Sequence, residues 1–463
     1  MRLPLPELVE GLKGRTCEPP GARRAVPARS VWDDFTVKAA VLGSPIAHSL
    51  SPALHRAGYA ALGLTEWSYG RFELVADELA DFVDGLDEQW RGLSLTMPLK
   101  DAALLVADEA TVLAVRAGAA NTLVRTENGW LADNTDIPGL VAALRPAWKG
   151  WTQAAILGAG ATARSAVLAL DELHVRNLRV YARNLDRAAK LVAWAGTVAP
   201  KLTVEIADLA TWTSGDEPAV ISTLPGGAAD PTGLNRRSGL LFDAVYAGWP
   251  TPLARAAGAA GMEVIGGAEL LLAQAALQFE LFTGQTPPEL AMRAAVAAAL
   301  SPKIVLIGFM GAGKTTVGRA LAGRLGMAFI DSDHVIEARG RSIPQVFASE
   351  GEAGFRALEA DVIADLLTGP PAVIALGGGA VSTPSVRELL RGHQVLLLDI
   401  PLAEALARVG DDPGRPMLAR DDLAQVYAAR QQLYAAAATA VLDADQEPDQ
   451  VADGAFRLIR ESH

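Results

Sequence analysis

The chain has 463 residues, of which half are hydrophobic and a fifth are charged, and its formal net charge is −12. This length exceeds what one hydrophobic core supports, so we expect two or three soluble domains. The acidic balance argues against nucleic acid or an anionic membrane surface as the main partner, because both select basic patches. The single cysteine, Cys17, has no partner for an internal disulfide, which fits a reducing compartment.

Neither an export signal nor a membrane span is expected, so we predict a cytoplasmic protein. Residues 1–20 lack the uninterrupted apolar stretch of an export signal. The one long apolar stretch, residues 294–313, is broken by Ser301, Pro302 and Lys303. Residues 1–36 are rich in proline and arginine and show no period, and we interpret them as a loose extension without an assigned function.

The first predicted strand spans residues 37–43 and leads through a turn to Ser49, Ser51 and a helix from Ala53 onward. Two hydroxyls spaced by two on an extended segment point the same way. Together with the N–H groups of a helix they can bind a carboxylate. The alternative is a simple helix N-cap at Ser51 with Pro52 at the first helical position.

Polar side chains recur at the ends of the strands that follow. Residues 92–97 alternate between apolar and polar positions, run past Thr96 into a proline turn and present Lys100. Asn121 and Asp136 close two later strand-like segments. Open α/β sheets bind their ligands at such strand ends, and a lysine–aspartate pair there can relay a proton to or from a carbonyl oxygen.

A dinucleotide-binding fingerprint comes next. A strand over residues 154–157 leads into Gly158-Ala159-Gly160-Ala161-Thr162-Ala163, which matches G-x-G-x-x-A, and a helix follows. This context predicts a pyrophosphate at the helix N-terminus. The next strand, 178–182, ends without the acidic residue that an NAD site places on the ribose hydroxyls. Arg183 and Arg187 follow instead and suit a 2′-phosphate, so NADP(H) is favoured.

Two more buried strands, 219–225 and 240–246, extend the same predicted sheet. A helix over residues 270–282 then carries Gln274 among apolar neighbours, where a lone glutamine is by default a hydrogen-bonded core residue. An alanine-rich helix up to residue 300 closes this half of the chain.

The most informative run spans residues 304–316, where a strand, a glycine-rich turn and a helix follow one another. Gly308, Gly313, Lys314 and Thr315 match G-x-x-x-x-G-K-[ST]. The backbone N–H groups of such a loop surround phosphate oxygens, the lysine supplies charge and the threonine hydroxyl can ligate Mg²⁺. The run therefore predicts a nucleotide phosphate site.

Two carboxylates follow the next predicted strand, 327–330. Asp331 and Asp333 would face the phosphates from the end of that strand, one holding the Mg²⁺ shell and one the acceptor hydroxyl. Later polar segments include a helix with Arg356 and a triple glycine at 377–379.

Seven segments between residues 37 and 300 jointly resemble shikimate dehydrogenase. In chain order they are 48–52, 95–100, 120–122, 133–136, the turn at Gly158, 243–246 and 273–275. The resemblance implies that Lys100 and Asp136 form the catalytic pair. It implies a shikimate pocket of Ser49, Ser51, Thr96, Lys100, Asn121, Asp136, Tyr246 and Gln274. With the two arginines above, it implies an NADP site of Gly158, Gly160, Ala161, Arg183, Arg187 and Gly267. The sequence departs from the family at Ser94, which replaces asparagine, and at Ala161 and Ala182, which replace glycine and asparagine.

From about Lys303 to its end, the chain resembles shikimate kinase. Besides the P-loop, the matching segments are 331–333, 355–359, 377–379, 415–418 and 430–434. The resemblance implies catalytic roles for Lys314, Asp333 and Arg415. It implies shikimate binding by Asp333, Arg356, Gly378, Gly379 and Arg430. It implies ATP binding by Gly311, Ala312, Gly313, Lys314, Thr315, Thr316, Arg408 and Arg415, with Mg²⁺ at Thr315 and Asp331.

We therefore expect an α/β protein with three ordered parts. They are a substrate domain over residues 37–137 and 262–300, a Rossmann NADP-binding domain over 138–261, and a nucleoside-monophosphate-kinase-like P-loop domain with a parallel sheet over 301–463. The expected function is reduction of 3-dehydroshikimate with NADPH, followed by phosphorylation of shikimate with MgATP. The alternatives are an NAD-dependent quinate/shikimate dehydrogenase fused to a kinase, or one half that serves as a non-catalytic regulatory module.

Overall fold

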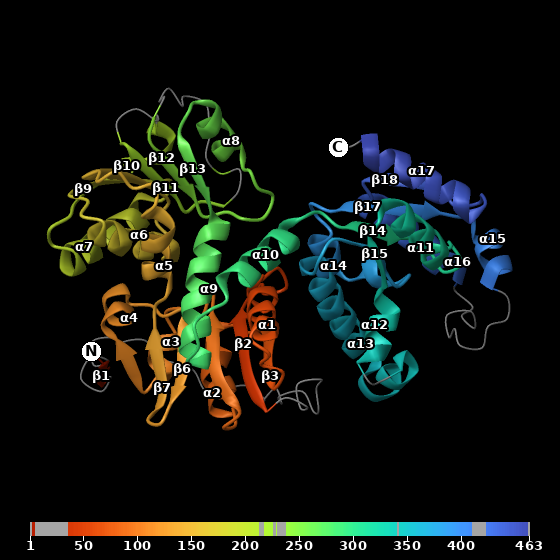
Figure 1. Cartoon of the computed structure of the whole chain (residues 1–463), viewed down its shortest axis with the longest axis horizontal. Helices are drawn as coiled ribbons and strands as arrows, with labels where there is room; N and C mark the ends of the chain where they lie inside the picture. The colour runs from red at the N-terminus through yellow and green to blue at the C-terminus, as the bar shows by residue number, and fades with distance from the viewer. Residues whose placement is uncertain are drawn as a thin grey trace. The chain divides into compact units, whose positions relative to one another are not determined.

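The computed structural model describes residues 2–4, 36–212, 217–225, 228, 238–339, 342–409 and 423–461. The chain divides into two compact units, Met1–Val296 and Ala297–His463, and each is described by itself (Figure 1). Within the described ranges, every helix is too short or too polar to span a bilayer.

The first unit opens with a mixed seven-stranded sheet in the order β1-β5-β7-β6-β4-β2-β3. Its strands are β1 (Arg2–Pro4), β2 (Val37–Gly43), β3 (Trp67–Glu73), β4 (Trp90–Leu95), β5 (Glu109–Thr111), β6 (Thr122–Thr126) and β7 (Gly129–Asp133). Its helices are α1 (Ser51–Ala61), α2 (Leu79–Asp84), α3 (Ala103–Val106) and α4 (Val112–Ala117). β2 is parallel to β3 and β4, whereas β6 is antiparallel to β4 and β7. β2 is buried over nearly its whole length, as expected for an apolar strand covered on both faces.

The short strand β1 lies within the segment that the sequence predicts to be a loose extension. It pairs antiparallel with β5, with Arg2 opposite Thr111. Residues 5–35 of that segment lie outside the described residues, so the prediction for them stays a prediction.

The first unit also contains a six-stranded parallel sheet in the order β10-β9-β8-β11-β12-β13. Its strands are β8 (Gln153–Leu157), β9 (Asn177–Ala182), β10 (Thr203–Asp208), β11 (Ala219–Ser222), β12 (Leu240–Asp243) and β13 (Glu263–Gly266). The helices α5 (Asp136–Leu144), α6 (Ala161–Glu172), α7 (Leu185–Val198) and α8 (Pro252–Ala259) connect or flank them. This order is that of a Rossmann sheet, with its switch point between β8 and β11, and it confirms the predicted fold. β12 ends at Asp243, three residues before the end of the predicted strand 240–246.

Helix α9 (Gly267–Thr283) returns the chain to the first sheet, and α10 (Glu289–Leu300) follows it. α9 contacts β4 and β6 of that sheet as well as α1 and α5. Its approach to α5 is close because Gly139 has no side chain: a Cβ there would lie 3.0 Å from the backbone nitrogen of Gln274. α5 begins at Asp136, three residues before Gly139. The close packing at Gly139 therefore brings Gln274 within about one helical turn of the Asp136 carboxylate.

The second unit contains a five-stranded parallel sheet in the order β15-β16-β14-β17-β18. Its strands are β14 (Ile304–Ile307), β15 (Ala328–Asp331), β16 (Ala372–Ala375), β17 (Gln394–Asp399) and β18 (Ala440–Asp443). Its helices are α11 (Lys314–Leu325), α12 (Ser332–Ala338), α13 (Ile343–Thr368), α14 (Pro384–Leu389), α15 (Leu402–Val409), α16 (Leu423–Ala437) and α17 (Pro448–Glu461). The central strand β14 is fully buried and delivers the glycine-rich loop to the carboxyl edge of the sheet, where α/β folds bind ligands.

Candidate active sites

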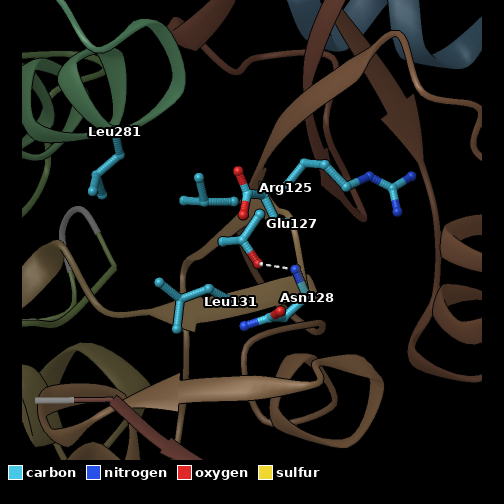
Figure 2. Close-up of a pocket in the computed structure, with 7 residues that line it drawn as sticks. Arg125, Glu127, Asn128, Leu131 and Leu281 are labelled. Atoms are coloured by element: carbon cyan, nitrogen blue, oxygen red, sulfur yellow. Dashed lines mark hydrogen bonds between the residues drawn. The ribbon is translucent and has the colours of Figure 1, made fainter.

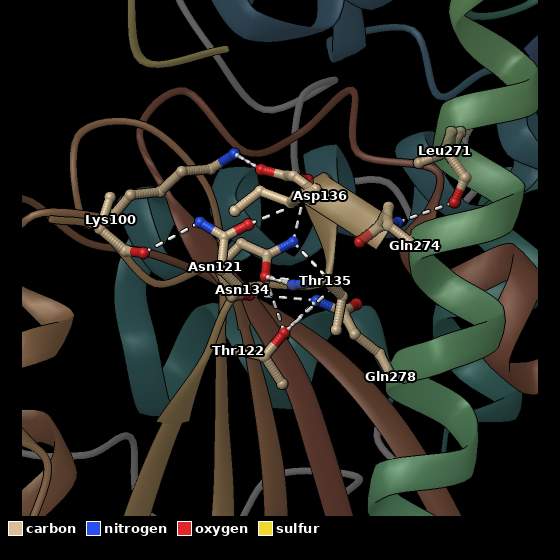
Figure 3. A network of polar contacts seen from close by, with 11 residues as sticks. Lys100, Asn121, Thr122, Asn134, Thr135, Asp136, Leu271, Gln274 and Gln278 are labelled. Atoms are coloured by element: carbon tan, nitrogen blue, oxygen red, sulfur yellow. Dashed lines mark hydrogen bonds and ion pairs between the residues drawn. The ribbon is translucent and has the colours of Figure 1, made fainter. Parts of the chain in front are cut away.

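An ion pair between Lys100 and Asp136 forms the centre of the first site (Figure 3). Lys100 Nζ lies 2.6 Å from Asp136 Oδ2, and the two side chains are only 19 and 12 % exposed. Asn121 Nδ2 donates to the other carboxylate oxygen at 2.9 Å. Asp136 is also the first residue of α5, where the helix dipole favours a negative charge. The structure thus brings together three of the residues that the sequence predicts for one pocket.

The paired serines lie at the start of α1. The N-cap residue of α1 is Leu50, whose side chain makes no capping hydrogen bond, and Ser51 is the first helical residue, so the structure does not support the alternative of an N-cap at Ser51. Ser49 Oγ accepts a hydrogen bond from Ser51 N at 3.4 Å. Ser51 is buried. Burial raises the pKa of the nearby Tyr69 phenol, an effect that the hydroxyls of Ser94 and Ser51 oppose.

The remaining predicted pocket residues are Thr96, Tyr246 and Gln274. Thr96 follows β4, and its N–H donates to Leu42 O at 2.9 Å. Burial raises the pKa of Tyr246, which keeps its hydroxyl protonated. Gln274 is buried on the side of α9 that faces Asp136, and its Nε2 donates to Leu271 O at 2.8 Å (Figure 3). Within the described residues, no hydrogen bond links these three side chains to the Lys100–Asp136 pair.

The glycine turn after β8 has the geometry of an anion site. Gly158 has a φ of 107°, a conformation that favours glycine, and Gly160 is the N-cap of α6, which begins at Ala161. Arg187 Nη2 lies 4.0 Å from where a Cβ of Gly160 would stand, so this guanidinium reaches the helix N-terminus. Both Arg187 and Arg183 are exposed. Helix N–H groups and a nearby arginine together fit a dinucleotide phosphate.

Gly267, predicted to lie near a nicotinamide, is the first residue of α9. Its backbone packs against the chain that follows β12, because a Cβ on Gly267 would lie 2.0 Å from Ala244 O. Any side chain at this position would displace one of the two segments.

Three glycines with positive φ angles shape the P-loop of the second unit. Gly308, Gly311 and Gly313 have φ values of 146°, 77° and 82°. Lys314 Nζ donates to the carbonyl oxygens of Gly308 at 2.8 Å and Phe309 at 3.0 Å, so the ammonium lies over the loop. Of the other predicted loop residues, Ala312 is buried and Thr316 is exposed at the start of α11. The loop and the N-terminus of α11 fit a nucleotide phosphate.

The predicted Mg²⁺ residues contact each other. Thr315 Oγ1 donates to Asp331 Oδ2 at 2.8 Å, while Asp331 Oδ1 accepts from Asp333 N at 3.1 Å. The described part of the chain holds no cluster of three or more His, Cys, Asp or Glu side chains suited to a metal. A hydroxyl and one carboxylate fit Mg²⁺ where phosphate oxygens and water complete its shell.

A group of charged side chains lies beside residues 377–379. Arg356 Nη1 lies 2.6 Å from Glu359 Oε2, and Glu359 is fully buried. Burial is the main cause that raises the pKa of Glu359, and Arg356 opposes it. Burial, followed by the charge of Asp331, also raises the pKa of Asp333. The guanidinium of Arg356 packs on Gly379, where a Cβ would lie 2.4 Å from Arg356 Nη2.

Helix α16 adds Arg430 and Tyr434 to this group. Burial lowers the pKa of Arg430, and its guanidinium carbon lies 5.9 Å from the centre of the Phe309 ring. Tyr434 OH donates to Gly378 O at 2.5 Å. Asp333 also belongs to this group, because a Cβ on Gly377 would lie 2.7 Å from Asp333 Oδ1 and 2.9 Å from Glu359 Oε1. The group thus joins the predicted residues Asp333, Arg356, Gly378, Gly379 and Arg430, and its two arginines suit a carboxylate ligand.

Of the two remaining residues predicted to bind ATP, the structure describes Arg408 but not Arg415. Arg408 Nη1 donates to Ala444 O at 2.8 Å, and its Nη2 lies 3.7 Å from Asp445 Oδ1. Arg415 lies outside the described residues, so its role stays a prediction.

Several residues that support these sites were not predicted as site residues from the sequence, namely Thr122, Thr135, Gln278 and Tyr434. Thr122, Thr135 and Gln278 bond to Asn121, and Tyr434 bonds to the glycine loop. For Gln278 a signal was present, because it lies four residues after Gln274 and so on the same helical face.

A separate hollow lies at the hairpin between β6 and β7 (Figure 2). It is lined by Val124, Arg125, Thr126, Glu127, Asn128, Leu131 and Leu281. None of the predicted site residues lines it.

Three parts of the chain match known protein families. Residues 41–123 match the shikimate dehydrogenase substrate binding domain, residues 267–297 the shikimate 5'-dehydrogenase C-terminal domain, and residues 310–460 shikimate kinase.

Individual relatives agree with these matches. A shikimate dehydrogenase (NADP(+)) from Caulobacter vibrioides is 40 % identical over 259 residues, covering 53 % of this chain and 90 % of the relative. A shikimate kinase from Mycobacterium avium is 46 % identical over 152 residues, covering 32 % of this chain and 86 % of the relative. The crystal structure of Mycobacterium tuberculosis shikimate dehydrogenase matches 57 % of this chain and 99 % of its own, with 46 % identity and a TM-score of 0.50. The chain therefore belongs to the shikimate dehydrogenase family in its first part and to the shikimate kinase family in its second.

Proposed function

We propose that this protein reduces 3-dehydroshikimate to shikimate with NADPH and phosphorylates shikimate at its 3-hydroxyl with MgATP. The observation that carries the proposal is that each unit holds its own set of contacting polar groups, Lys100 with Asp136 in one and Lys314 beside Thr315 and Asp331 in the other. Its partners are small molecules, and we place both activities in the cytoplasm, where NADPH and ATP are available.

In the first reaction, Lys100 acts on the ketone oxygen of the substrate. Bound NADPH supplies the hydride that reduces the ring carbon. Lys100 donates a proton to the oxygen, which becomes the new hydroxyl, and Asp136, whose Oδ2 lies 2.6 Å from the lysine nitrogen, orients the lysine side chain. Asn121 holds the second carboxylate oxygen, so that Asp136 does not rotate away. The hydroxyls of Ser49 and Ser51, at the N-terminus of α1, bind the substrate carboxylate.

The preference for NADPH over NADH is assigned to Arg183 and Arg187. Their position after β9 suits the 2′-phosphate, and a charge-assisted hydrogen bond to it would contribute about 1.5–3 kcal/mol, or roughly a tenfold to hundredfold preference. We expect kcat/KM with NADPH to exceed that with NADH by at least about tenfold. Equal use of NADH, or a preference for 3-dehydroquinate over 3-dehydroshikimate, would favour the NAD-dependent quinate/shikimate dehydrogenase instead.

In the second reaction, the chain binds the acceptor and neutralises the phosphates. Bound MgATP supplies the γ-phosphoryl group. Asp333, whose pKa is raised, accepts the proton of the acceptor hydroxyl, while Arg356 and Arg430 bind the shikimate carboxylate. Lys314 neutralises charge on the phosphates, and Thr315 with Asp331 would hold Mg²⁺.

Two substitutions test whether the sites are independent. We expect Lys100→Ala to abolish shikimate-dependent NADP⁺ reduction and to spare shikimate-dependent ATP turnover, whereas Lys314→Ala should do the reverse. Loss of both activities from either change, in protein that stays folded, would contradict two independent sites. An unmodified protein that shows only one of the two activities would support the alternative in which one half is a regulatory module.

A further inference from the structure

Gln278, a buried glutamine of α9, belongs to none of the steps above, yet it bonds to the segments that carry them. It is 1 % exposed. Its Oε1 accepts from Ser94 Oγ at 2.7 Å, and its Nε2 donates to Thr122 Oγ1 at 2.9 Å and Asn121 O at 3.1 Å. Both N–H donors of this amide and one lone pair of its oxygen are therefore directed at the end of the first sheet (Figure 3).

The partners of Gln278 lie on two neighbouring strands. Ser94 of β4 and Thr122 of β6 face each other in the antiparallel register. The chain after Ser94 continues to Lys100, and the residue before Thr122 is Asn121. By bonding to both strands, Gln278 fixes the spacing of two segments that deliver side chains to the Lys100–Asp136 pair.

The hydrogen bonds beyond Gln278 have a defined direction. Once Thr122 Oγ1 accepts from Gln278, its own hydrogen is available for Asn121 Oδ1, which lies 2.9 Å away. The Asn121 oxygen accepts from Thr135 N at 2.8 Å as well, and with its oxygen held by these two donors the amide presents Nδ2 to Asp136 Oδ1. Asp136 Oδ2 in turn accepts from Lys100. The series starts at the Gln278 amide and ends at the catalytic ion pair.

The hydrogen bonds on the oxygen side of the Gln278 amide also have a defined direction. Tyr69 OH donates to Ser94 Oγ at 2.6 Å, which leaves the Ser94 hydrogen for Gln278 Oε1. This arrangement fixes the amide with its oxygen toward Ser94 and its nitrogen toward Thr122. A reversed amide would place two donors or two acceptors against each other.

We propose that Gln278 is a positioning residue of the dehydrogenase site, which acts through Thr122 and Asn121 to orient Asp136 for proton transfer with Lys100. The inference rests on the dehydrogenase function proposed above. Gln278 itself bonds to neither member of the ion pair; its effect is on their geometry, where a small displacement is costly to the rate.

The first test replaces the amide by a side chain of similar size without hydrogen bonds. We expect Gln278→Leu to lower kcat/KM for shikimate by about 10- to 100-fold, while KM for NADP⁺ stays within about twofold. The kinase activity of the same preparation should not change, which makes it an internal control. The matched control is Glu280→Leu, which introduces the same residue at an exposed position of α9. A folded Gln278→Leu protein with unchanged dehydrogenase activity would overturn the inference.

The second test separates positioning from a purely structural role and does not depend on Gln278→Leu folding. In Gln278→Glu, the introduced carboxylate has no hydrogen to donate to Thr122 or Asn121, and protonation restores one donor. Its activity relative to wild type should therefore rise as the pH is lowered from about 9 to about 6, because burial raises the pKa of the new carboxyl. A constant ratio across this range would indicate packing alone and contradict the proposal.

A double substitution tests the route through Thr122. If Gln278 acts through the Thr122 hydroxyl, Gln278→Leu combined with Thr122→Val should cost little more than the larger single effect. If the fold-reductions of the two single substitutions multiply in the double variant, Gln278 does not act through the Thr122 hydroxyl. Wild-type protein without shikimate-dependent NADP⁺ reduction would instead refute the proposed function itself, so the two failures are distinguishable.

Discussion

The fully buried His55 of α1 predicts that the first unit loses stability in mild acid. Its ring stacks on Tyr69 with centroids 4.1 Å apart, and Phe279 and Phe282 lie within 6.1 Å. Neither ring nitrogen has a hydrogen-bond partner among the described residues. Burial lowers the pKa of His55 from 6.5 to about 3, so the imidazole is neutral in the folded state.

The size of this stability loss follows from the difference in His55 protonation between the folded and the unfolded chain. Between pH 6.5 and pH 3 the unfolded chain binds a proton at this histidine and the folded chain does not, so the free energy of unfolding falls as the pH falls through this range. From pH 7 to pH 4.5 the loss is about 2.5 kcal/mol. The full loss of about 5 kcal/mol would be reached only below about pH 3, where the folded chain binds the proton as well. In His55→Leu, which has no titrating group there, this part of the pH dependence should disappear.

Urea unfolding followed by tryptophan fluorescence measures this effect, because all nine tryptophans lie at or before Trp249 and report on the first unit alone. Wild type and His55→Leu should differ in their change of unfolding free energy between pH 7 and pH 4.5 by about 2.5 kcal/mol. If both proteins lose the same unfolding free energy between pH 7 and pH 4.5, His55 is not buried as a neutral base, which would refute the prediction.

Three further predictions concern the second unit. Gly379→Ala should reduce kcat/KM for shikimate in the kinase assay by at least about tenfold, since the new methyl group would displace the Arg356 guanidinium, and a normal kcat/KM in steady-state kinetics would contradict this. Tyr434→Phe removes the hydrogen bond to Gly378 O and should raise KM for shikimate in the kinase assay by about 3- to 10-fold, with unchanged dehydrogenase activity as the control. EDTA should abolish ATP turnover and leave NADP⁺ reduction intact, and a dehydrogenase that is equally sensitive to EDTA would show that the metal requirement is not confined to the P-loop site.

Elements with a strong local pattern were predictable from the sequence. The strand at residues 37–43 coincides with β2, and the P-loop strand and the dinucleotide turn lie where their patterns indicate. β10 gave no such signal, because it is an edge strand with mostly exposed side chains and therefore has little apolar periodicity. The predicted strand 240–246 was too long at its C-terminal end, since apolar residues continue past the last parallel partner at Asp243.

The candidate sites were predictable where chemistry coincides with a strand end. Lys100 and Asp136 are 36 residues apart, yet topology alone brings such strand ends to one edge of a sheet. Residues that support them were not predictable in this way. Gln278 and Ser94 are 184 residues apart, and their hydrogen bond depends on how α9 packs on β4, which no local pattern specifies.

The two buried glutamines of α9 also limit how this part of the chain can vary in length. Gln274 and Gln278 are four residues apart and both lie on the enclosed side of the helix. One inserted or deleted residue between them would turn the following part of the helix by about 100°, which would expose one glutamine whenever the other stayed in place. We therefore expect homologous chains to differ here by substitution at exposed positions such as Glu280, and to keep the number of residues between the two glutamines constant.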